Sequence, residues 1–141
     1  MGLPHLIVPG CIDMANFGGM ETVPAKYKDA GRTFYEWNPS VTLMRTNAEE
    51  NKLMGEKFAE KANAAKGPVV VLIPLKGVSI LDGDGEMFCD RDADQAMFDA
   101  LKANRNDDIE VVEIDNNIND AAFSAKAVEM MLTLIEKAKS A

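Results

Sequence analysis

The sequence predicts an α/β fold, a three-layer α/β/α sandwich with a mainly parallel, Rossmann-like sheet. Three apolar runs rich in β-branched residues alternate with three amphipathic stretches, an order typical of parallel βαβ units. Two of the runs are continuously apolar, as expected for strands covered by helices on both faces. A single domain spanning residues 1–141 is expected, because this length suits one hydrophobic core.

The expected strands are His5–Val8, Pro68–Ile73 and Ile109–Ile114. The third run alternates more in polarity than the others, which places it nearer an edge of the sheet. A fourth strand is expected in Arg32–Trp37 or in Val41–Arg45.

Three helices are expected, from Thr46 to about Lys66, from Asp92 to about Ala103 and from Asp120 to about Lys139. The first opens with a capping-box pattern, Thr46 followed by Glu49, and the second with Asp92 as N-cap. Apolar residues at helical spacing, among them Leu53 on the first helix and Val128 on the third, are expected to face the core.

A long irregular arm, residues 14–45, is expected after the first strand. It contains five of the nine aromatic residues of the chain: Phe17, Tyr27, Phe34, Tyr35 and Trp37. A disordered linker would be poor in aromatic residues. The arm is therefore expected to be ordered and to pack on this domain or on a partner chain.

Composition and charge exclude several functional classes. The formal net charge is −8, without the basic cluster that nucleic-acid binding requires. The longest apolar run, Val69–Pro74, is far shorter than the ~20 residues that span a bilayer. Because no N-terminal signal pattern is present either, we expect a cytoplasmic protein. Cys11 and Cys89 are expected to be reduced thiols, and no metal-site spacing is present.

Candidate binding residues lie where the expected strands end, because ligands of open α/β sheets bind at the carboxyl ends of the strands. Gly10 follows the first strand. Lys76, Gly77 and Ser79 follow the second strand and could hold an anion through charge, close backbone approach and a hydroxyl group. The alternative for Lys76 is an exposed turn with a solvated side chain.

Two further candidates lie beside these loops. Arg45 and Thr46 directly precede a helix N-terminus, which is a favourable place for an anion. The alternative for Arg45 is a salt bridge with Glu49 or Glu50. Asp13 could bind a ribose hydroxyl, accept a proton or hold a metal, and its alternative is a turn or cap residue.

Several phrases of the chain resemble one family. They are Pro9-Gly10-Cys11-Ile12-Asp13, Asn38-Pro39, Thr42-Leu43-Met44-Arg45-Thr46, Pro74-Leu75-Lys76-Gly77-Val78-Ser79 and Ile118-Asn119-Asp120. In this order they resemble the Tm-one-like ATP-binding domain family, named after a plant tobamovirus-resistance protein. The resemblance covers nearly the whole chain.

The resemblance implies a chain with two α/β halves, of which this sequence is similar to the C-terminal one. It implies ATP as a ligand. Because ATP-binding proteins often hold Mg²⁺ with one or two carboxylates and the phosphates, Mg²⁺ is a candidate companion ion. Arg45, Lys76 and Ser79 would then contact phosphates, and Asp13 and Asn38 would make polar contacts. Trp37 stands before Asn38 where the family pattern has histidine, which removes an acid–base group or metal ligand.

Three hypotheses follow for function. The first is a nucleotide- or small-anion-binding domain, with backbone amides near Gly10 and Gly77 completing the site. The second is a subunit of an enzyme acting on a small carboxylate or phosphate compound, with Asp13 as acid–base group. The third is a protein-interaction module that uses the arm. Homo-oligomerisation, or association with a chain carrying the N-terminal half, is expected because half of a protein exposes apolar surface.

Overall fold

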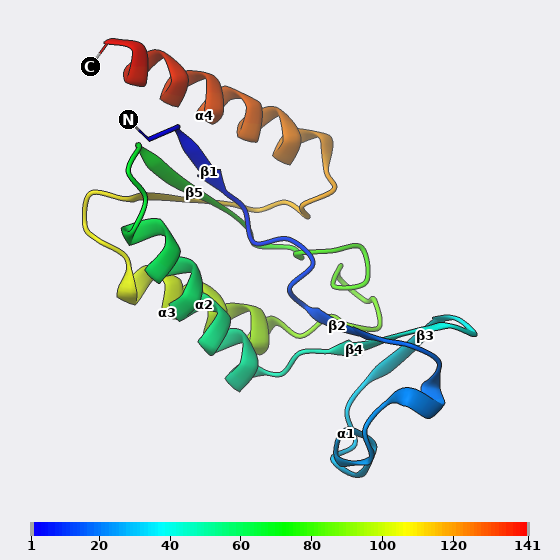
Figure 1. Ribbon diagram of the computed structural model, residues 1–141. Helices are drawn as coiled ribbons and strands as arrows, with labels where there is room; N and C mark the ends of the chain where they lie inside the picture. Colours follow the sequence, from blue (N-terminus) through cyan, green and yellow to red (C-terminus); the bar gives the residue numbers. More distant parts are fainter. Residues whose placement is uncertain (1, 141) are drawn as a thin grey trace.

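The computed structural model describes residues 2–140 and contains two three-stranded sheets (Figure 1). The parallel sheet has the order β1 (His5–Ile7), β5 (Val69–Pro74), β6 (Glu110–Ile114). The antiparallel sheet has the order β2 (Met14–Phe17), β4 (Val41–Arg45), β3 (Phe34–Asn38). The predicted α/β class and the edge position of β6 are confirmed, whereas one mainly parallel sheet is replaced by two sheets of different kinds.

Helices cover both faces of the parallel sheet. Helices α2 (Ala48–Asn63) and α3 (Arg91–Asn104) lie side by side on one face, and α4 (Ala121–Ser140) lies on the other (Figure 1). The side chains of β5 alternate between the two layers. Val71 and Ile73 join the core beneath α2 and α3, whereas Val70 and Leu72 join the core beneath α4. The continuously apolar sequence of β5 thus reflects burial on both faces.

The three predicted helices are present, with different caps. The capping box of α2 is formed by Asn47 and Glu50, one residue later than predicted. The N-cap of α3 is Asp90, whose carboxylate accepts from the Ala93 N–H at 3.0 Å. Asp92 was the wrong choice because it already lies within the first helical turn.

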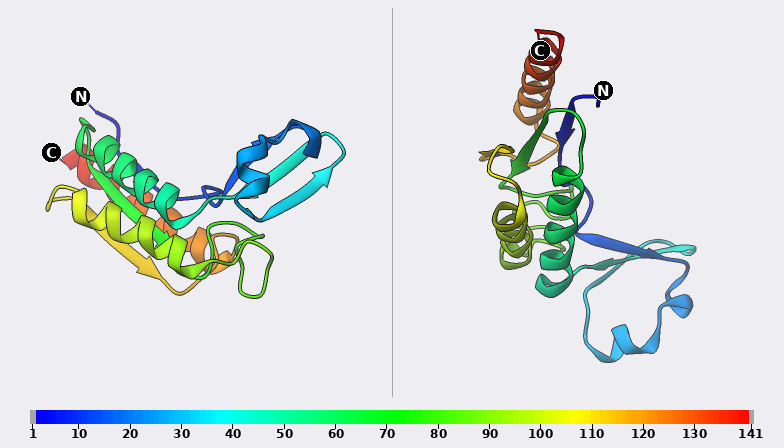
Figure 2. Two further views of the ribbon diagram at one scale, coloured as in Figure 1. Left: turned by 90° about the horizontal axis from the view of Figure 1, so that it is seen from below. Right: turned by 60° about the vertical axis from the view of Figure 1, so that its left-hand side comes forward.

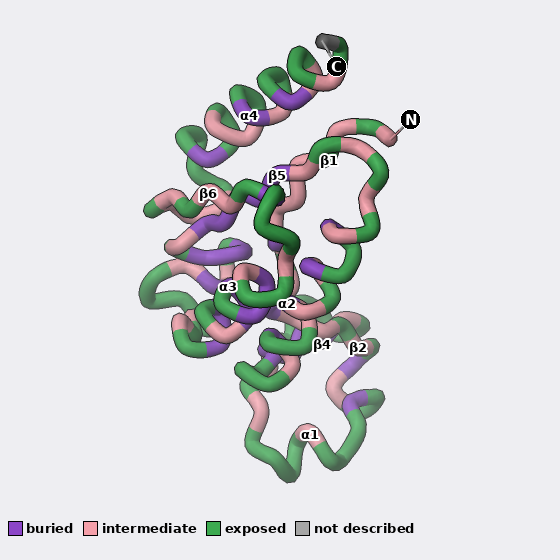
Figure 3. Tube along the Cα trace, turned by 90° about the vertical axis from the view of Figure 1, so that its left-hand side faces the viewer, coloured by how far each residue is buried: buried purple, intermediate pink, exposed green. Residues whose placement is uncertain are grey.

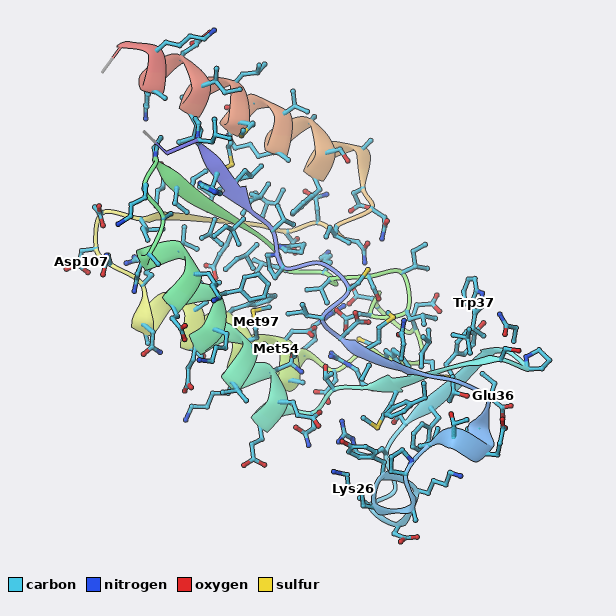
Figure 4. The ribbon with its side chains drawn as sticks, in the orientation of Figure 1. Lys26, Glu36, Trp37, Met54, Met97 and Asp107 are labelled. Atoms are coloured by element: carbon cyan, nitrogen blue, oxygen red, sulfur yellow. The ribbon has the colours of Figure 1, made fainter. Side chains whose placement is uncertain are left out.

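Two residues predicted to face the core are exposed. Leu53 on α2 is 56% exposed and Val128 on α4 is 59% exposed. The buried residues of α2 instead include Gly55, Ala59 and Ala62, because this helix packs closely against α3. Met54 of α2 and Met97 of α3 lie near one another in this layer (Figure 4).

The arm is ordered, as predicted, but it is not irregular. It contains the antiparallel sheet, the 3₁₀ turn Met20–Thr22 and the short helix α1 (Ala25–Asp29). Both candidate segments for a fourth strand are strands, β3 and β4, and they pair with each other. The strand β2 was not predicted, since its sequence MANF has no β-branched residue.

The arm forms a lobe that projects away from the helices and the parallel sheet (Figure 2). Most of its backbone is exposed or half-buried (Figure 3). The segment before β1 and the C-terminal end of α4 lie together at the opposite end of the molecule (Figure 1). Among residues 2–140, no helix combines the length and the apolar character needed to cross a membrane.

Candidate functional site

The loops that follow β1, β5 and β6 meet at the carboxyl edge of the parallel sheet. Three backbone hydrogen bonds join them: Cys11 N–H to Val78 O at 2.8 Å, Ile118 N–H to Gly77 O at 3.0 Å, and Lys76 N–H to Asn116 O at 3.1 Å. The topology therefore brings Gly10, Lys76, Gly77 and Ser79 into one region, as the strand-end argument predicted.

Gly77 occupies a position that only glycine fits. Its φ is +126°, and a Cβ there would lie 2.5 Å from Asn117 Nδ2 and 2.8 Å from the Asp82 carbonyl oxygen. The Asn117 amide donates to the carbonyl groups of Lys76 at 3.1 Å and Ser79 at 2.9 Å. Asn117 thus fixes the shape of the loop after β5, a role that sequence reasoning missed.

Lys76 supplies an accessible positive charge at this edge. Its ammonium lies 3.4 Å from Asp115, and the two side chains are 49% and 75% exposed. An exposed pair of this kind contributes only about 0–1 kcal/mol, so it yields readily to a better anion. Within residues 2–140, the Gly77 N–H makes no hydrogen bond, whereas its neighbours Lys76 and Val78 are paired.

Asp13 lies buried beneath these loops. One carboxylate oxygen, Oδ2, accepts from the Ser79 hydroxyl at 2.6 Å, and the other, Oδ1, has no partner among the described residues. Burial raises the pKa of Asp13, against the lowering effect of the hydrogen bond from Ser79 and of Arg45 nearby. Asp13 and Ser79, far apart in sequence, are thus direct partners.

Thr46 connects the start of α2 to the segment between β1 and β2. Its N–H donates to the Asp13 carbonyl at 2.9 Å, and its hydroxyl donates to the Ile12 carbonyl at 2.8 Å. The buried Asn51 amide donates to the Thr46 hydroxyl at 2.9 Å. Thr46 is buried, and these contacts give it a positioning role at the site.

Arg45 is buried in a cluster of carboxylates. Its guanidinium contacts Asp82 at 3.0 Å and Asp94 at 2.7 Å, and its Nε–H donates to the Phe88 carbonyl at 2.7 Å. The alternative salt bridge with Glu49 or Glu50 is wrong, because Glu50 pairs with Arg32. The Arg45 guanidinium therefore binds carboxylates within the protein.

Asp82 is the centre of this cluster. Its other oxygen accepts from the Val78 N–H at 2.8 Å and lies 3.3 Å from Arg91. Burial raises the pKa of Asp82 to about 7, with the neighbouring Asp94 adding to the effect and Arg45 opposing it. Sequence alone offered no signal for the cluster, since Asp82 and Asp94 are distant from Arg45 along the chain.

Two other residues discussed above lie differently. Asn38 is at the end of β3, where its carboxamide oxygen accepts from the Ser40 N–H in the turn to β4. With the neighbouring Trp37 it lies on the projecting arm, away from the parallel sheet (Figure 4). Cys11 is exposed and has a φ of +54°. Partial desolvation of its thiol raises the thiol pKa, and the negative charge of Asp13 adds a smaller effect in the same direction.

The donor set of the site suits an anion better than a resident cation. Within the described part of the chain, no group of three or more His, Cys, Asp or Glu side chains could hold a metal ion. Gly77 and the Lys76 ammonium offer positive character to a phosphate. A separate cavity of about 370 Å³ is lined by residues that include Arg45, Cys89 and Arg91.

Comparison with known proteins places the chain among longer relatives. It is 44% identical over 138 residues to a UPF0261 protein of Clostridium tetani, covering 97% of this chain and 34% of the relative. It is 45% identical over 139 residues to a UPF0261 protein of Mesorhizobium japonicum, covering 94% of this chain and 33% of the relative. The chain thus spans about a third of the length of these relatives.

The tomato ToMV resistance protein Tm-1(GCR237) from Solanum lycopersicum is also related. It is 35% identical over 139 residues, which cover 97% of this chain and 18% of that protein. Residues 1–135 match the C-terminal domain of the uncharacterised protein family UPF0261. The resemblance to the Tm-one-like family is therefore confirmed, and the chain belongs to the UPF0261 family, whose C-terminal domain it matches.

Proposed function

We propose that the carboxyl edge of the parallel sheet binds a small anion, the phosphate of a nucleotide such as ATP, as part of a site completed by the rest of a longer protein. The observation that carries this proposal is the fixed loop around Gly77. Its unpaired N–H and the exposed Lys76 ammonium lie where the loops after β1, β5 and β6 are hydrogen-bonded together. Helices on both faces of the sheet support a Rossmann-like interpretation of this core.

The candidate residues divide into contacting and positioning groups. Lys76 is exposed, Gly10 is half-buried and Gly77 is buried. The Lys76 ammonium and the Gly10 backbone would contact the anion, and the Gly77 N–H would be its buried donor. Ser79, Asp13 and Thr46 are buried and would hold the loops in place. Arg45 would act through Asp82, whose carboxylate accepts the Val78 N–H and so shapes the loop after β5.

A partial site agrees with the length of the relatives. Only one cation, Lys76, is present on the three loops, while a triphosphate normally requires several donors and Mg²⁺. Asp13 is a carboxylate near this edge, but it is buried beneath the loops. The remaining donors, and any ligands of Mg²⁺, would therefore come from the other part of the longer protein.

Thermal unfolding in the presence of ligands tests the proposal. The wild-type chain is titrated with inorganic phosphate, ATP, and ATP with Mg²⁺, and a hundredfold excess over Kd should add about 2.7 kcal/mol to the unfolding free energy. Lys76→Ala should abolish the shift. Lys57→Ala, which removes a similarly exposed lysine paired with Glu60 on α2, should leave it intact.

The same titration on a chimera, in which this chain replaces the C-terminal third of the Clostridium tetani relative, tests the partial site. A larger shift in the chimera would support a shared site. No shift in either protein, or a shift that Lys76→Ala leaves unchanged, would contradict the proposal.

A catalytic role for Asp13 is the second candidate. A buried carboxyl group with a raised pKa and one unpartnered oxygen is typical of acid–base residues. Turnover of a small phosphate or carboxylate compound that is lost in Asp13→Asn, with unfolding unchanged, would favour an enzyme. Retained turnover in that variant would exclude Asp13 as the acid–base group.

A further inference from the structure

Helix α4 carries apolar side chains on two opposite faces. Phe123, Met130 and Leu134 pack on the parallel sheet. A second series, which we name the outer face of α4, consists of Ala121, Ala125, Val128, Leu132 and Ile135. Its members follow one another in alternating steps of four and three residues, so they form a single stripe along the helix. At 100° per residue, the two stripes lie roughly 160° apart around the helix axis.

The outer face of α4 is uncovered in this structure. Val128 is 59% exposed and Leu132 is 56% exposed, and Ala121 and Ala125 are also exposed. Polar residues such as Lys126, Glu129 and Thr133 occupy another strip of the helix, and Lys139 continues the outer stripe at its C-terminal end. A helix that is apolar around most of its circumference is typical of a buried helix rather than an outer layer.

An apolar groove lies next to the outer face at the amino ends of the strands. It has a volume of about 770 Å³, and its lining includes Leu3, Pro4, Ile135 and Ala138. Leu3 is 80% exposed. Because Ile135 belongs to both surfaces, the outer face and the groove form one apolar surface that extends to the segment before β1.

We propose that this surface is the docking site of the polypeptide that precedes this domain in the longer UPF0261 proteins. The matched unit is a C-terminal domain, and the relatives are about three times as long as the matched segment. The preceding polypeptide therefore reaches this domain at its N-terminal segment, where Leu3 lines the groove. In the assembled protein α4 becomes an internal helix, with the sheet on one side and the preceding domain on the other.

The charges around the groove define the chemistry of the docked segment. Lys66, Lys137 and Lys139 line the groove together with the apolar residues. A segment with apolar side chains at its centre and acidic side chains at its margin complements this surface. A second copy of this chain would bring the same lysines to the contact and is disfavoured. The surface is separate from the anion site, which lies at the carboxyl edge of the sheet.

Thiol reactivity in the chimera with the Clostridium tetani relative tests the docking. Cys11 and Cys89 are first replaced by serine. Leu132→Cys then places a thiol on the outer face, and Thr133→Cys places one on the adjacent polar strip as a matched control. Both positions are exposed in this structure, so without a docked segment their rates of reaction with a maleimide should be similar. With the segment docked, the thiol of Leu132→Cys should react at least about tenfold more slowly.

Two controls separate docking from other causes. Both thiols should react equally fast in denaturant, and the protection should persist when light scattering shows a monomer. Equal rates in the folded chimera would overturn the proposal. Protection that disappears on dilution to the monomer would also overturn it, because the occupant would then be a second copy.

Discussion

At the scale of single residues, the loop after β5 depends on one glycine. Gly77 combines a left-handed φ with close contacts to Asn117 and to the Asp82 carbonyl group. Gly85 also has a positive φ, +81°, but a Cβ there would meet nothing within 4 Å. Comparing an alanine substitution at each of these two glycines therefore separates the energetic cost of backbone strain from that of steric overlap.

Gly77→Ala should destabilise the protein more than Gly85→Ala. Backbone strain alone costs about 1–2 kcal/mol for an L-residue in the left-handed region, and Gly77→Ala adds displacement of Asn117 from its two carbonyl acceptors. The free energy of unfolding in urea measures both changes. Equal losses of stability in the two variants would show that the close contacts of Gly77 carry no energetic weight.

Residue-level prediction from sequence succeeded where the strand-end rule applies. Gly10, Asp13, Lys76 and Ser79 were placed in one region because each follows a predicted strand, and the hydrogen bonds between the loops place them there. Whether these residues bind an anion stays a prediction. The partners of Arg45 were missed because no local pattern links an arginine to carboxylates 37 and 49 residues away.

At the scale of elements, Arg45 joins the arm to the rest of the molecule. It is the last residue of β4, and its partners lie in the loop after β5 and in the first turn of α3. Removing one member of a buried ion-pair cluster leaves the other charges without compensation. The Arg45 cluster is therefore a buried electrostatic contact between the arm and the rest of the molecule, beside the Arg32–Glu50 pair.

Arg45→Met should cost about 3–5 kcal/mol of stability near pH 7.5. The loss should shrink as the pH falls toward 5. Without the guanidinium, the pKa of buried Asp82, already about 7, rises further. The folded state then binds a proton that the unfolded chain, with a carboxyl pKa of about 4, does not bind until lower pH, so acid stabilises the variant. Urea unfolding at several pH values measures the difference.

Arg32→Met is the matched control for this experiment. Arg32 pairs with Glu50, whose side chain is 37% exposed, so its loss leaves a carboxylate that water can solvate. The loss of stability in Arg32→Met should be smaller than in Arg45→Met, and it should not diminish as the pH falls from 7.5 to 5. A pH-independent loss in Arg45→Met would contradict the role given to Asp82 and Asp94.

Element prediction failed mainly in the arm. Two of the parallel strands, β1 and β5, are recognisable by continuous apolar runs, whereas β2 has no β-branched residue and β3 mixes apolar and polar residues. Their pairing with β4 is set by register and by the contacts at the arm's base, which a single sequence does not display. The N-caps of α2 and α3 were predicted one residue too early and two residues too late, because several polar residues lie at each helix start.

At the scale of the whole molecule, the core and the tip of the arm contribute very differently to stability. Replacing Phe88, which is 1% exposed, by alanine should lower the free energy of unfolding by about 3–5 kcal/mol. Replacing Trp37, which is 65% exposed, by alanine should change the free energy of unfolding by no more than about 0.5 kcal/mol. Chemical denaturation of the two variants gives both values. A large loss in Trp37→Ala would mean that the tip packs on another surface of the protein in solution.

The contact between Asp13 and Thr46 at the base of the arm also has a consequence for folding kinetics. Pairing of β1 with β5 closes a long loop between them, and about half of that loop belongs to the arm. The hairpin of β3 and β4 pairs residues close in sequence, so the arm can form early. Once Thr46 is bound to Asp13, the remaining loop is half as long, which lowers its closure cost by about 0.6 kcal/mol. Early formation of the arm would then accelerate the formation of the parallel sheet, because a shorter loop remains to be closed when β1 pairs with β5.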